Sequence, residues 1–498
     1  MFITIKDDLN DKKQAKLFRS KKRRINLESK IPVHTFLLSV CTGAFLSHFS
    51  AGFVNIALTD ISIDFSAKLS VTQWIVNGYL LAIMLFLPLM GKLADQFGKK
   101  RIHNLGYLIF AVGACGSALS FNIPMLIIAR VIQGGGAAML QAVNMAIVTD
   151  VYPEKHRGKA LGIISTSVGI GALLGPSVGG FFIESFSWHI LFWTVVPISL
   201  GAYFLAQRFV PIDRHFENSS FDYKGSIYFG IGIVSFVFVL NSIGEGAFKI
   251  YLLGIACMSV ACFLFFFFHS KKEEHPFIQP SIFSSPIVKA GGLILMTSYC
   301  AAFASTVILP FYLRGVVGFT AEQSGLLLMC YPLFLAVLGP ISGSLADRFG
   351  GEKVVLVGLG LLCITMLGLS FLSPGTSLPI LIALLCLLGF SMGILTSPNY
   401  SIMMLYVPLQ FLGMMSSTIA LLRNIGMVIG TALAITFMNM WLDGTITDWM
   451  NDTRRSDFEA VMLGFHYLFL LLFALLVLIA IYFVYSVRRK KKEEWEEG

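Results

Sequence analysis

The sequence predicts an all-α integral membrane protein, and three observations support this fold class. Hydrophobic residues make up 56% of the 498 positions and charged residues only 13%, whereas a soluble domain carries about 25% charged residues. Apolar runs of about 20 residues, long enough to cross a bilayer, recur with short polar turns between them. A motif near the start of the chain also recurs far downstream. Together they exclude a soluble enzyme, a disordered chain and a nucleic-acid-binding protein.

Fourteen runs are long enough to span the membrane, and each is predicted to be a helix, because only helices and closed barrels satisfy the backbone in lipid. The predicted spans are 33–58, 71–91, 104–121, 124–149, 159–183, 189–209, 225–243, 249–269, 288–312, 322–344, 354–372, 378–400, 412–441 and 461–486.

The distribution of Lys and Arg predicts the orientation. With a cytoplasmic N-terminus, thirty of these residues fall on the cytoplasmic side and five on the outside, as the positive-inside rule requires. We therefore expect a basic cytoplasmic tail at 1–32, a second cytoplasmic tail at 487–498, and a multi-pass protein of the plasma membrane. The two remaining cations, Arg130 and Arg423, lie within spans.

An internal repeat predicts the architecture. The stretch 91–98 reads GKLADQFG and the stretch 343–350 reads GSLADRFG, 252 residues later. A duplicated unit explains this match better than chance. The prediction is two six-helix bundles, at 33–209 and 288–486, joined by a linker at 210–287 that carries two extra spans. A duplicated helical bundle with a site at its interface is typical of secondary transporters.

No cofactor, metal or catalytic site is expected. All eight cysteines lie in apolar runs and none forms a CxxC pair, which argues against disulfide or zinc sites. The chain has no HExxH motif and no phosphate-binding Walker loop. The sequence therefore predicts that the protein is not an enzyme and that any pumping draws on an ion gradient.

The first copy of the repeat contains an aspartate that ends span 2 and a cluster of cations after it. Such a carboxylate can accept hydrogen bonds from helix N-termini or pair with the cations. The glycines permit close helix contact and a tight turn. A solvated loop with ordinary turn glycines is the alternative. The candidate gating residues are Gly91, Asp95, Gly98, Lys99, Lys100, Arg101 and Asp150, with Asp347 and Arg348 as a weaker copy.

A run of small residues marks span 5. Small residues let helices approach closely in lipid, and a proline within the run removes a backbone hydrogen bond and can bend the helix. Generic helix packing is the alternative reading. The residues of this motif are Gly171, Gly175, Pro176, Gly179 and Gly180.

These motifs resemble the major facilitator superfamily over residues 36–486. Its hallmark is the Gly-x-Leu-Ala-Asp-x-Phe-Gly stretch between helices 2 and 3, and further matches are 130–138, 188–192, 221–225 and 310–313. Fourteen spans point to the drug:proton antiporter branch of multidrug efflux type. The resemblance implies that the stretch around Asp95 latches one state of the transport cycle and that the span 5 run is an antiporter motif, found mainly in exporters.

Polar residues within the apolar spans outline a candidate central cavity. Arg130 is expected either to act in proton or substrate coupling, because intramembrane charges usually face a bundle interior or water, or to be a structural arginine that bonds to backbone carbonyls. The candidate cavity and coupling residues are His48, Ser50, Asn55, Arg130, Gln133, Asn144, Glu184 and Arg423.

The acidic residues depart from the pattern of the branch that the chain resembles, whose members commonly carry an acid in helix 1. Here Ser50 or Ala51 occupies that place, and none of the 28 acidic residues lies near a span centre. Proton coupling would then use a rim acid such as Glu184 or Asp60, or His48, because the unperturbed pKa of histidine is near neutral. Otherwise coupling is weak or absent. Two intramembrane arginines without an acid favour a neutral or anionic substrate.

The sequence thus predicts a monomeric secondary transporter that exports a small amphipathic compound in exchange for protons by rocker-switch alternating access. Membrane lipid is the other expected partner. The alternative is a lipid or glycolipid flippase, or an exporter dedicated to one envelope metabolite, on the same fold. The missing acid in helix 1 mildly favours this alternative.

Overall fold

The computed structural model is helical throughout the residues it describes, which are 33–67, 72, 74–212, 222–244, 250–274, 276, 278–319, 321–408, 411–440 and 458–497. Four predicted site residues, Asn55, Pro176, Gly180 and Glu184, belong to described helices, but their side chains lie outside the description. The predicted N-terminal tail also lies outside the described residues.

Six long helices form the first half of the molecule. They are α2 (Val33–Asp64), α4 (Trp74–Phe97), α5 (Lys99–Ala118), α6 (Ile123–Val151), α7 (Glu154–Ser185) and α8 (Trp188–Phe209). Local sequence starts two of them: the Asn122 side chain accepts a hydrogen bond from the backbone of Met125 at the head of α6, and Ser187 accepts one from His189 at the head of α8. Such N-caps satisfy backbone donors that have no partner within the helix.

The second half repeats this arrangement. Its helices are α11 (Pro286–Phe311), α12 (Ala321–Leu328), α13 (Cys330–Phe349), α14 (Gly351–Ser370), α15 (Leu378–Leu405), α16 (Leu412–Asn439) and α18 (Phe458–Glu497). A short 3-10 helix, η1 (Pro280–Phe283), precedes α11, and a π-helical turn, η2 (Tyr312–Val316), follows it. The predicted span at 322–344 is formed by α12 and α13 together.

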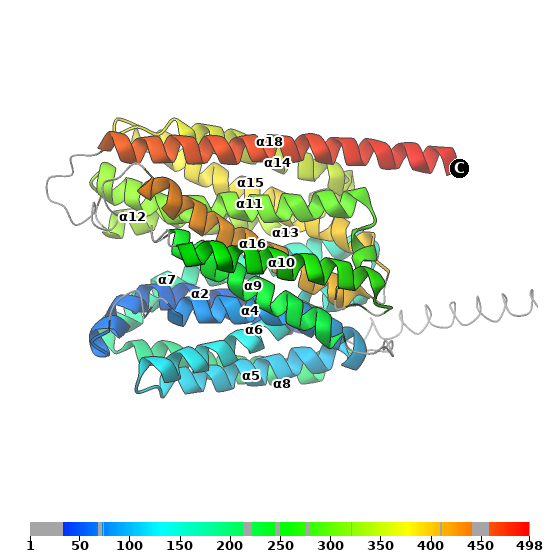
Figure 1. The fold of residues 1–498 in the computed structure, drawn as a ribbon, viewed down its shortest axis with the longest axis horizontal. Helices are drawn as coiled ribbons and strands as arrows, with labels where there is room; N and C mark the ends of the chain where they lie inside the picture. The colour runs from blue at the N-terminus through cyan, green and yellow to red at the C-terminus, as the bar shows by residue number, and fades with distance from the viewer. Residues whose placement is uncertain are drawn as a thin grey trace, which may run out of the picture.

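Two helices connect the halves, namely α9 (Tyr223–Gly244) and α10 (Ile250–Lys272). Asp222 holds them together at one end: its carboxylate accepts a 2.7 Å hydrogen bond from the backbone of Gly225 at the head of α9, and it lies 2.8 Å from Nε2 of His269 on α10. Figure 1 shows the first half, the second half with α18 at its far edge, and the pair α9–α10 across the junction, where α9 contacts both α4 and α16.

The fold confirms the predicted fourteen-span helical architecture. Thirteen helical segments among the described residues are long and apolar enough to cross a membrane. The remaining span is α5, which begins with Lys99, Lys100 and Arg101 and is therefore less apolar than the others. It packs between α6 and α8 within the first half. At the other end of the chain α18 runs to Glu497, so most of the predicted C-terminal tail continues the last helix.

The repeated motif forms the same backbone structure twice. A single residue, Gly98, separates α4 from α5, and Gly350 separates α13 from α14 in the same way. Their φ angles are 105° and 92°, a region that residues with a Cβ atom adopt only at a cost. The motif is therefore a sharp break between two helices rather than an extended loop.

We expect Gly98→Ala to destabilise the protein by about 1 to 2 kcal/mol, because alanine at this φ is strained. The midpoint of thermal unfolding in detergent measures the effect. Gly360→Ala is the matched control, because a Cβ at this position in α14 meets no atom within 4 Å and alanine favours a helix over glycine. Equal unfolding midpoints for the two variants would contradict the claim that a residue with a Cβ atom is strained at position 98.

Candidate gate and central polar site

Asp95 joins the two halves at one end of the bundle. It lies near the end of α4, is 5% exposed, and accepts hydrogen bonds from the backbone N–H groups of Gly413 (2.9 Å) and Met414 (2.8 Å). These donors belong to the start of α16, in the other half. The first N–H groups of a helix have no partner within it, and the helix dipole favours a negative charge there. One carboxylate thus caps a helix of the opposite half.

Asp347 makes the same contact in the reverse direction. From the end of α13 it accepts hydrogen bonds from the backbone N–H groups of Gly158 and Lys159, both at 3.1 Å, at the start of α7. The sequence suggested that Asp347 belongs to a weaker copy of the motif. Its hydrogen bonds are longer than the 2.8 and 2.9 Å bonds of Asp95, and they reach the fifth and sixth residues of α7 rather than its first turn. The second copy therefore joins the halves in the opposite direction with a looser contact.

Glycines allow the halves to meet this closely. A Cβ atom built on Gly91 would lie 2.1 Å from Oγ of Ser417, and one on Gly343 would lie 2.0 Å from the carbonyl oxygen of Gly158. Neither distance is possible for real atoms. Any larger residue at Gly91 or Gly343 would push the halves apart.

The contact between the halves continues along α7 and α13. A Cβ on Gly162 would lie 2.2 Å from the carbonyl oxygen of Gly339, and Oγ1 of Thr166 donates a 2.6 Å hydrogen bond to the carbonyl of Ala336. Together with the two aspartate caps, this seam closes the molecule at the end that carries Asp95. This conformation is therefore closed at one end of the bundle.

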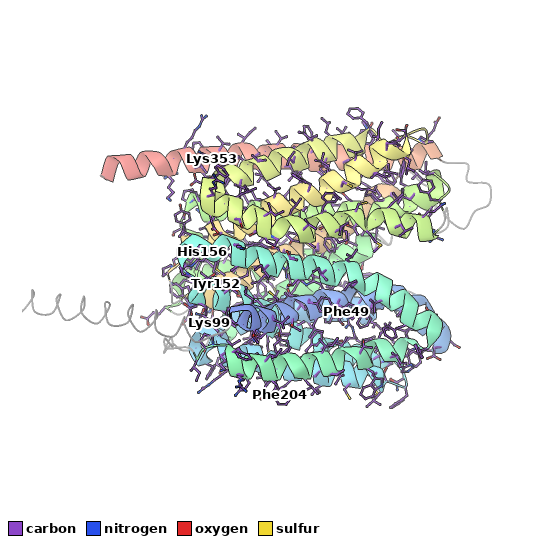
Figure 2. The ribbon with its side chains drawn as sticks, turned by 180° about the vertical axis from the view of Figure 1, so that it is seen from behind. Phe49, Lys99, Tyr152, His156, Phe204 and Lys353 are labelled. Atoms are coloured by element: carbon purple, nitrogen blue, oxygen red, sulfur yellow. The ribbon has the colours of Figure 1, made fainter. Side chains whose placement is uncertain are left out.

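The cations near Asp95 have different partners. Lys99, whose side chain is 10% exposed, forms a 2.8 Å ion pair with Asp150 of α6, within the first half. Lys100 donates to the backbone carbonyl of Gln207 on α8, and Arg101 is exposed. In the second copy, the guanidinium of Arg348 lies over the ring of its neighbour Phe349. Figure 2 shows Lys99 at the same end of the bundle as Tyr152, His156 and Lys353.

Arg130 organises a buried polar cluster inside the first half. Its Nη1 donates to Oγ of Ser50 (2.9 Å) and to Oε1 of Gln133 (2.6 Å), and its Nε donates to the carbonyl of Ile75 (3.3 Å). The guanidinium also lies 3.9 Å from the centre of the Tyr79 ring, a favourable cation–π geometry. Arg130, Gln133 and Ser50 are fully buried, so a substrate can reach them only after the helices move.

A second cluster crosses between the halves. Oε1 of Gln141 on α6 accepts hydrogen bonds from Arg423 (2.7 Å) and from Asn424 (3.3 Å), both on α16. The amide nitrogen of Gln141 donates to Oγ of Ser47, and the Tyr79 hydroxyl donates to the backbone carbonyl of the same serine at 2.9 Å. Since Tyr79 also packs against Arg130, the two arginine sites are connected through one ring.

Several buried polar atoms keep unused hydrogen-bonding capacity. Nη2 of Arg130, Nε of Arg423 and Oδ1 of Asn144 have no partner among the described residues. Because buried polar groups are nearly always satisfied, these atoms mark places for water or a ligand. His48 lies apart from the Arg130 cluster, and its Nδ1 donates to the carbonyl of Ala44 at 2.9 Å.

The small residues of span 5 pack within their own half. Cβ atoms on Gly171, Gly175 and Gly179 would lie 2.6 to 3.0 Å from atoms of Phe45, Phe49 and Phe53 on α2. The helix α7 therefore has two glycine-bearing faces, one against α2 and one against α13.

Sequence reasoning missed the partners of the two aspartates. Gly158, Lys159, Gly413 and Met414 contribute through their backbones, which leaves no side-chain signal. Ser47 was also missed as a site residue, although it lies one turn before Ser50 on α2. The one-turn spacing of Ser47 and Ser50 on α2, together with Gln133 and Gln141 two turns apart on α6, could have indicated that Ser47 is a site residue.

We expect Asp95→Ala to open the closed end, because it removes two charge-assisted hydrogen bonds worth about 1.5 to 3 kcal/mol each. In a chain whose native cysteines are replaced, a cysteine at the buried position Ser417 should react with a water-soluble maleimide at least about tenfold faster in the variant. Asp150→Ala is the control, because its partner Lys99 lies in the same half. Unchanged labelling in Asp95→Ala would show that the caps do not hold this end closed.

Comparison with known families places this geometry among transporters. The family model described as Major Facilitator Superfamily matches residues 40–431 and 291–498. The chain is 32% identical over 404 residues to the riboflavin transporter RibZ of Clostridioides difficile, covering 80% of this chain and 87% of that protein. It is 30% identical over 396 residues to the multidrug resistance protein B homolog of Mycobacterium tuberculosis, covering 78% and 73%.

Solved structures share the fold at low sequence identity. The human organic anion transporter MFSD10 superposes with a TM-score of 0.60 at 17% identity, over 89% of this chain and 99% of that one. The proton:xylose symporter XylE superposes with a TM-score of 0.59 at 16% identity, over 90% and 94%.

Proposed function

Because the chain belongs to the major facilitator superfamily, we propose that it exports a small amphipathic compound, neutral or anionic, in exchange for protons. Membership makes it an integral membrane transporter of a small molecule rather than an enzyme. The direction of transport, the class of substrate and the coupling ion are what we propose. We further propose that the protein acts as a monomer in the plasma membrane, with both termini in the cytoplasm.

The two aspartate caps support alternating access. They close the end of the bundle that carries Lys99 and Asp150, which the distribution of cations assigns to the cytoplasm. A rocker-switch motion that opens this end has to break both caps together, because each aspartate is held by a helix of the opposite half. We propose that Asp95 and Asp347 are the cytoplasmic gate.

The two buried arginines support the proposed class of substrate. Among the described residues, Arg130 and Arg423 bond only to neutral groups: a serine, two glutamines and a backbone carbonyl. A buried charge without a counter-ion is costly. An anionic or acceptor-rich substrate would offset this cost by taking the donors at Nη2 of Arg130 and Nε of Arg423, whereas a permanent cation would be repelled.

A planar heteroaromatic metabolite is a second candidate substrate. The relative RibZ, at 32% identity over most of both chains, is described as a riboflavin transporter. A flavin ring offers several hydrogen-bond acceptors and a flat face. The donors of Arg130 inside the first half and of Arg423 on α16, together with the Tyr79 ring, suit both features.

We propose that His48 carries the coupled proton. It lies on α2, next to Ser47, and its Nδ1 donates to the carbonyl of Ala44, so Nε2 is the ring nitrogen that would take the proton. A proton on His48 would add a third positive charge near Arg423. This charge would link the binding of the proton to the binding of an anionic substrate.

Substrate accumulation in inverted membrane vesicles tests the substrate class. We expect uptake of an anionic dye or of riboflavin, and loss of at least about tenfold in rate on Arg130→Ala, since a substrate hydrogen bond to a charged group contributes about 1.5 to 3 kcal/mol. Lys353→Ala, at an exposed cation in the first turn of α14, is the control for a general loss of charge. Robust uptake of a permanently cationic dye, with no uptake of the anion, would overturn the proposal. Transfer of a labelled lipid between leaflets without either uptake would indicate the flippase alternative.

The pH gradient across energised vesicles tests coupling. Addition of a transported substrate should partly collapse the gradient in the native protein, and the collapse should disappear in His48→Gln while binding of substrate to purified protein persists. Gln preserves the size and the polar character of the side chain but cannot titrate. An undiminished collapse in His48→Gln would assign coupling to another residue.

A further inference from the structure

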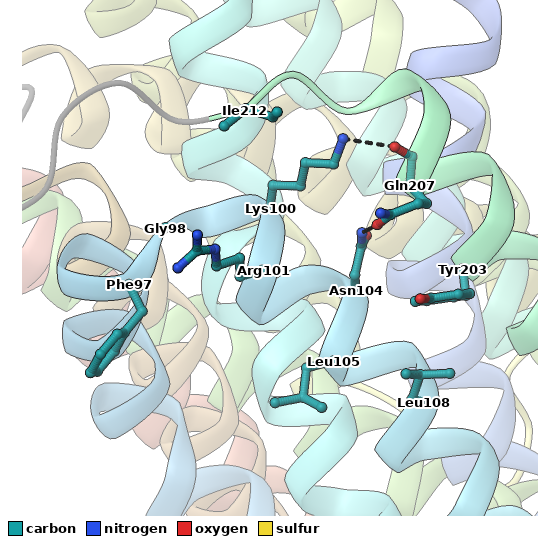
Figure 3. Close-up of a pocket in the computed structure, with 10 residues that line it drawn as sticks. All are labelled: Phe97, Gly98, Lys100, Arg101, Asn104, Leu105, Leu108, Tyr203, Gln207 and Ile212. Carbon is teal, nitrogen blue, oxygen red and sulfur yellow. Dashed lines mark hydrogen bonds between the residues drawn. The ribbon is translucent and has the colours of Figure 1, made fainter.

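A groove of about 400 Å³ opens on the outer surface of the first half, between the start of α5 and the end of α8. Figure 3 shows its lining, with two cations at the rim and apolar side chains below them. The lining residues are Phe97, Gly98, Lys100, Arg101, Asn104, Leu105, Leu108, Tyr203, Gln207 and Ile212. None of them belongs to the central polar site or to the two aspartate caps.

The rim of the groove is rigid and positively charged. Nζ of Lys100 donates a 2.7 Å hydrogen bond to the carbonyl of Gln207, and the amide of Asn104 donates to Oε1 of the same residue. These bonds fix the start of α5 against the end of α8. Arg101, one residue on, is exposed, and Figure 3 shows its guanidinium beside Gly98, while the ammonium of Lys100 reaches toward Gln207 on the other side. An exposed guanidinium beside this rim is suited to an anion.

The walls of the groove continue into an apolar surface. On α5, Leu105 and Val112 are 44% and 63% exposed, and on α8, Phe204 is 67% exposed. In a membrane-spanning bundle such side chains face the hydrocarbon of the bilayer. Figure 2 shows Phe204 on the outer edge of the first half, away from the seam with the second half. The cations therefore lie where the apolar surface ends.

We propose that this groove binds one anionic phospholipid, with the phosphate at Arg101 and an acyl chain along Leu105, Leu108 and Tyr203. The occupant has to carry a negative group and an apolar chain in that order along the membrane normal, which matches the order of the lining residues. A soluble anion would leave the apolar floor uncovered. A zwitterionic lipid would bring its own cation next to the guanidinium.

The repeat supplies a matched control. Lys353 in the second half occupies the position equivalent to Arg101, 252 residues later. It is exposed, in the first turn of α14, and lies at the same end of the bundle. It therefore matches Arg101 in charge and in its position in the repeated motif, but it does not line the groove.

Native mass spectrometry of the purified full-length chain in detergent tests the proposal. The probes are phosphatidylglycerol, phosphatidylcholine with the same acyl chains, and glycerol 3-phosphate as a soluble headgroup. We expect one phosphatidylglycerol to bind at least about fivefold more tightly than phosphatidylcholine, and Arg101→Gln to lower that affinity about fivefold, the usual effect of one basic residue at a membrane surface. Arg101→Lys should retain most of the affinity, and Lys353→Gln should leave it unchanged.

Three outcomes would overturn the proposal. Equal binding of the two lipids would remove the role of charge. An equal loss in Arg101→Gln and Lys353→Gln would mean general attraction of anions to this end of the molecule. Binding of glycerol 3-phosphate as tight as that of phosphatidylglycerol would assign the groove to a soluble phosphate compound instead. Transport of the substrate does not enter any of these measurements, so failure of the proposed function would leave this test unaffected.

Discussion

The closed conformation depends on two carboxylates that cap helices of the opposite half. Asp95 caps the first turn of α16, and Asp347 accepts hydrogen bonds from Gly158 and Lys159, the fifth and sixth residues of α7. Each aspartate lies near the end of one helix, and a glycine in each recipient helix lets the backbones approach closely. The internal repeat thus joins the two halves at this end by one contact in each direction.

The distribution of charge follows from the same arrangement. At the closed end Asp95 and Asp347 accept hydrogen bonds from backbone donors, whereas Asp150 pairs with Lys99. Lys100 donates to the backbone of α8. The centre of the bundle holds the opposite charge: Arg130 and Arg423 are surrounded by neutral acceptors. Acidic gate and basic centre are therefore separated along the membrane normal.

The helix α7 has two glycine-bearing faces, and these allow it to pack against a helix of each half. The face at Gly171, Gly175 and Gly179 fixes α7 onto α2, while the face at Gly158 and Gly162 lies against α13. The first contact is internal to one half, and the second lies between the halves. The described glycines of the span 5 motif thus pack within the first half in this conformation.

The sequence by itself determined the spans, the duplication and the importance of Asp95 and Arg130, because hydropathy, repeated motifs and intramembrane charge are all local properties. The tertiary structure decided which atoms those residues meet. The caps use backbone N–H groups of Gly158 and Gly413, about 190 and 320 residues away from their aspartates, and backbone donors carry no residue signature. The same holds for Ile75, whose carbonyl holds Arg130, because any residue there would offer the same atom.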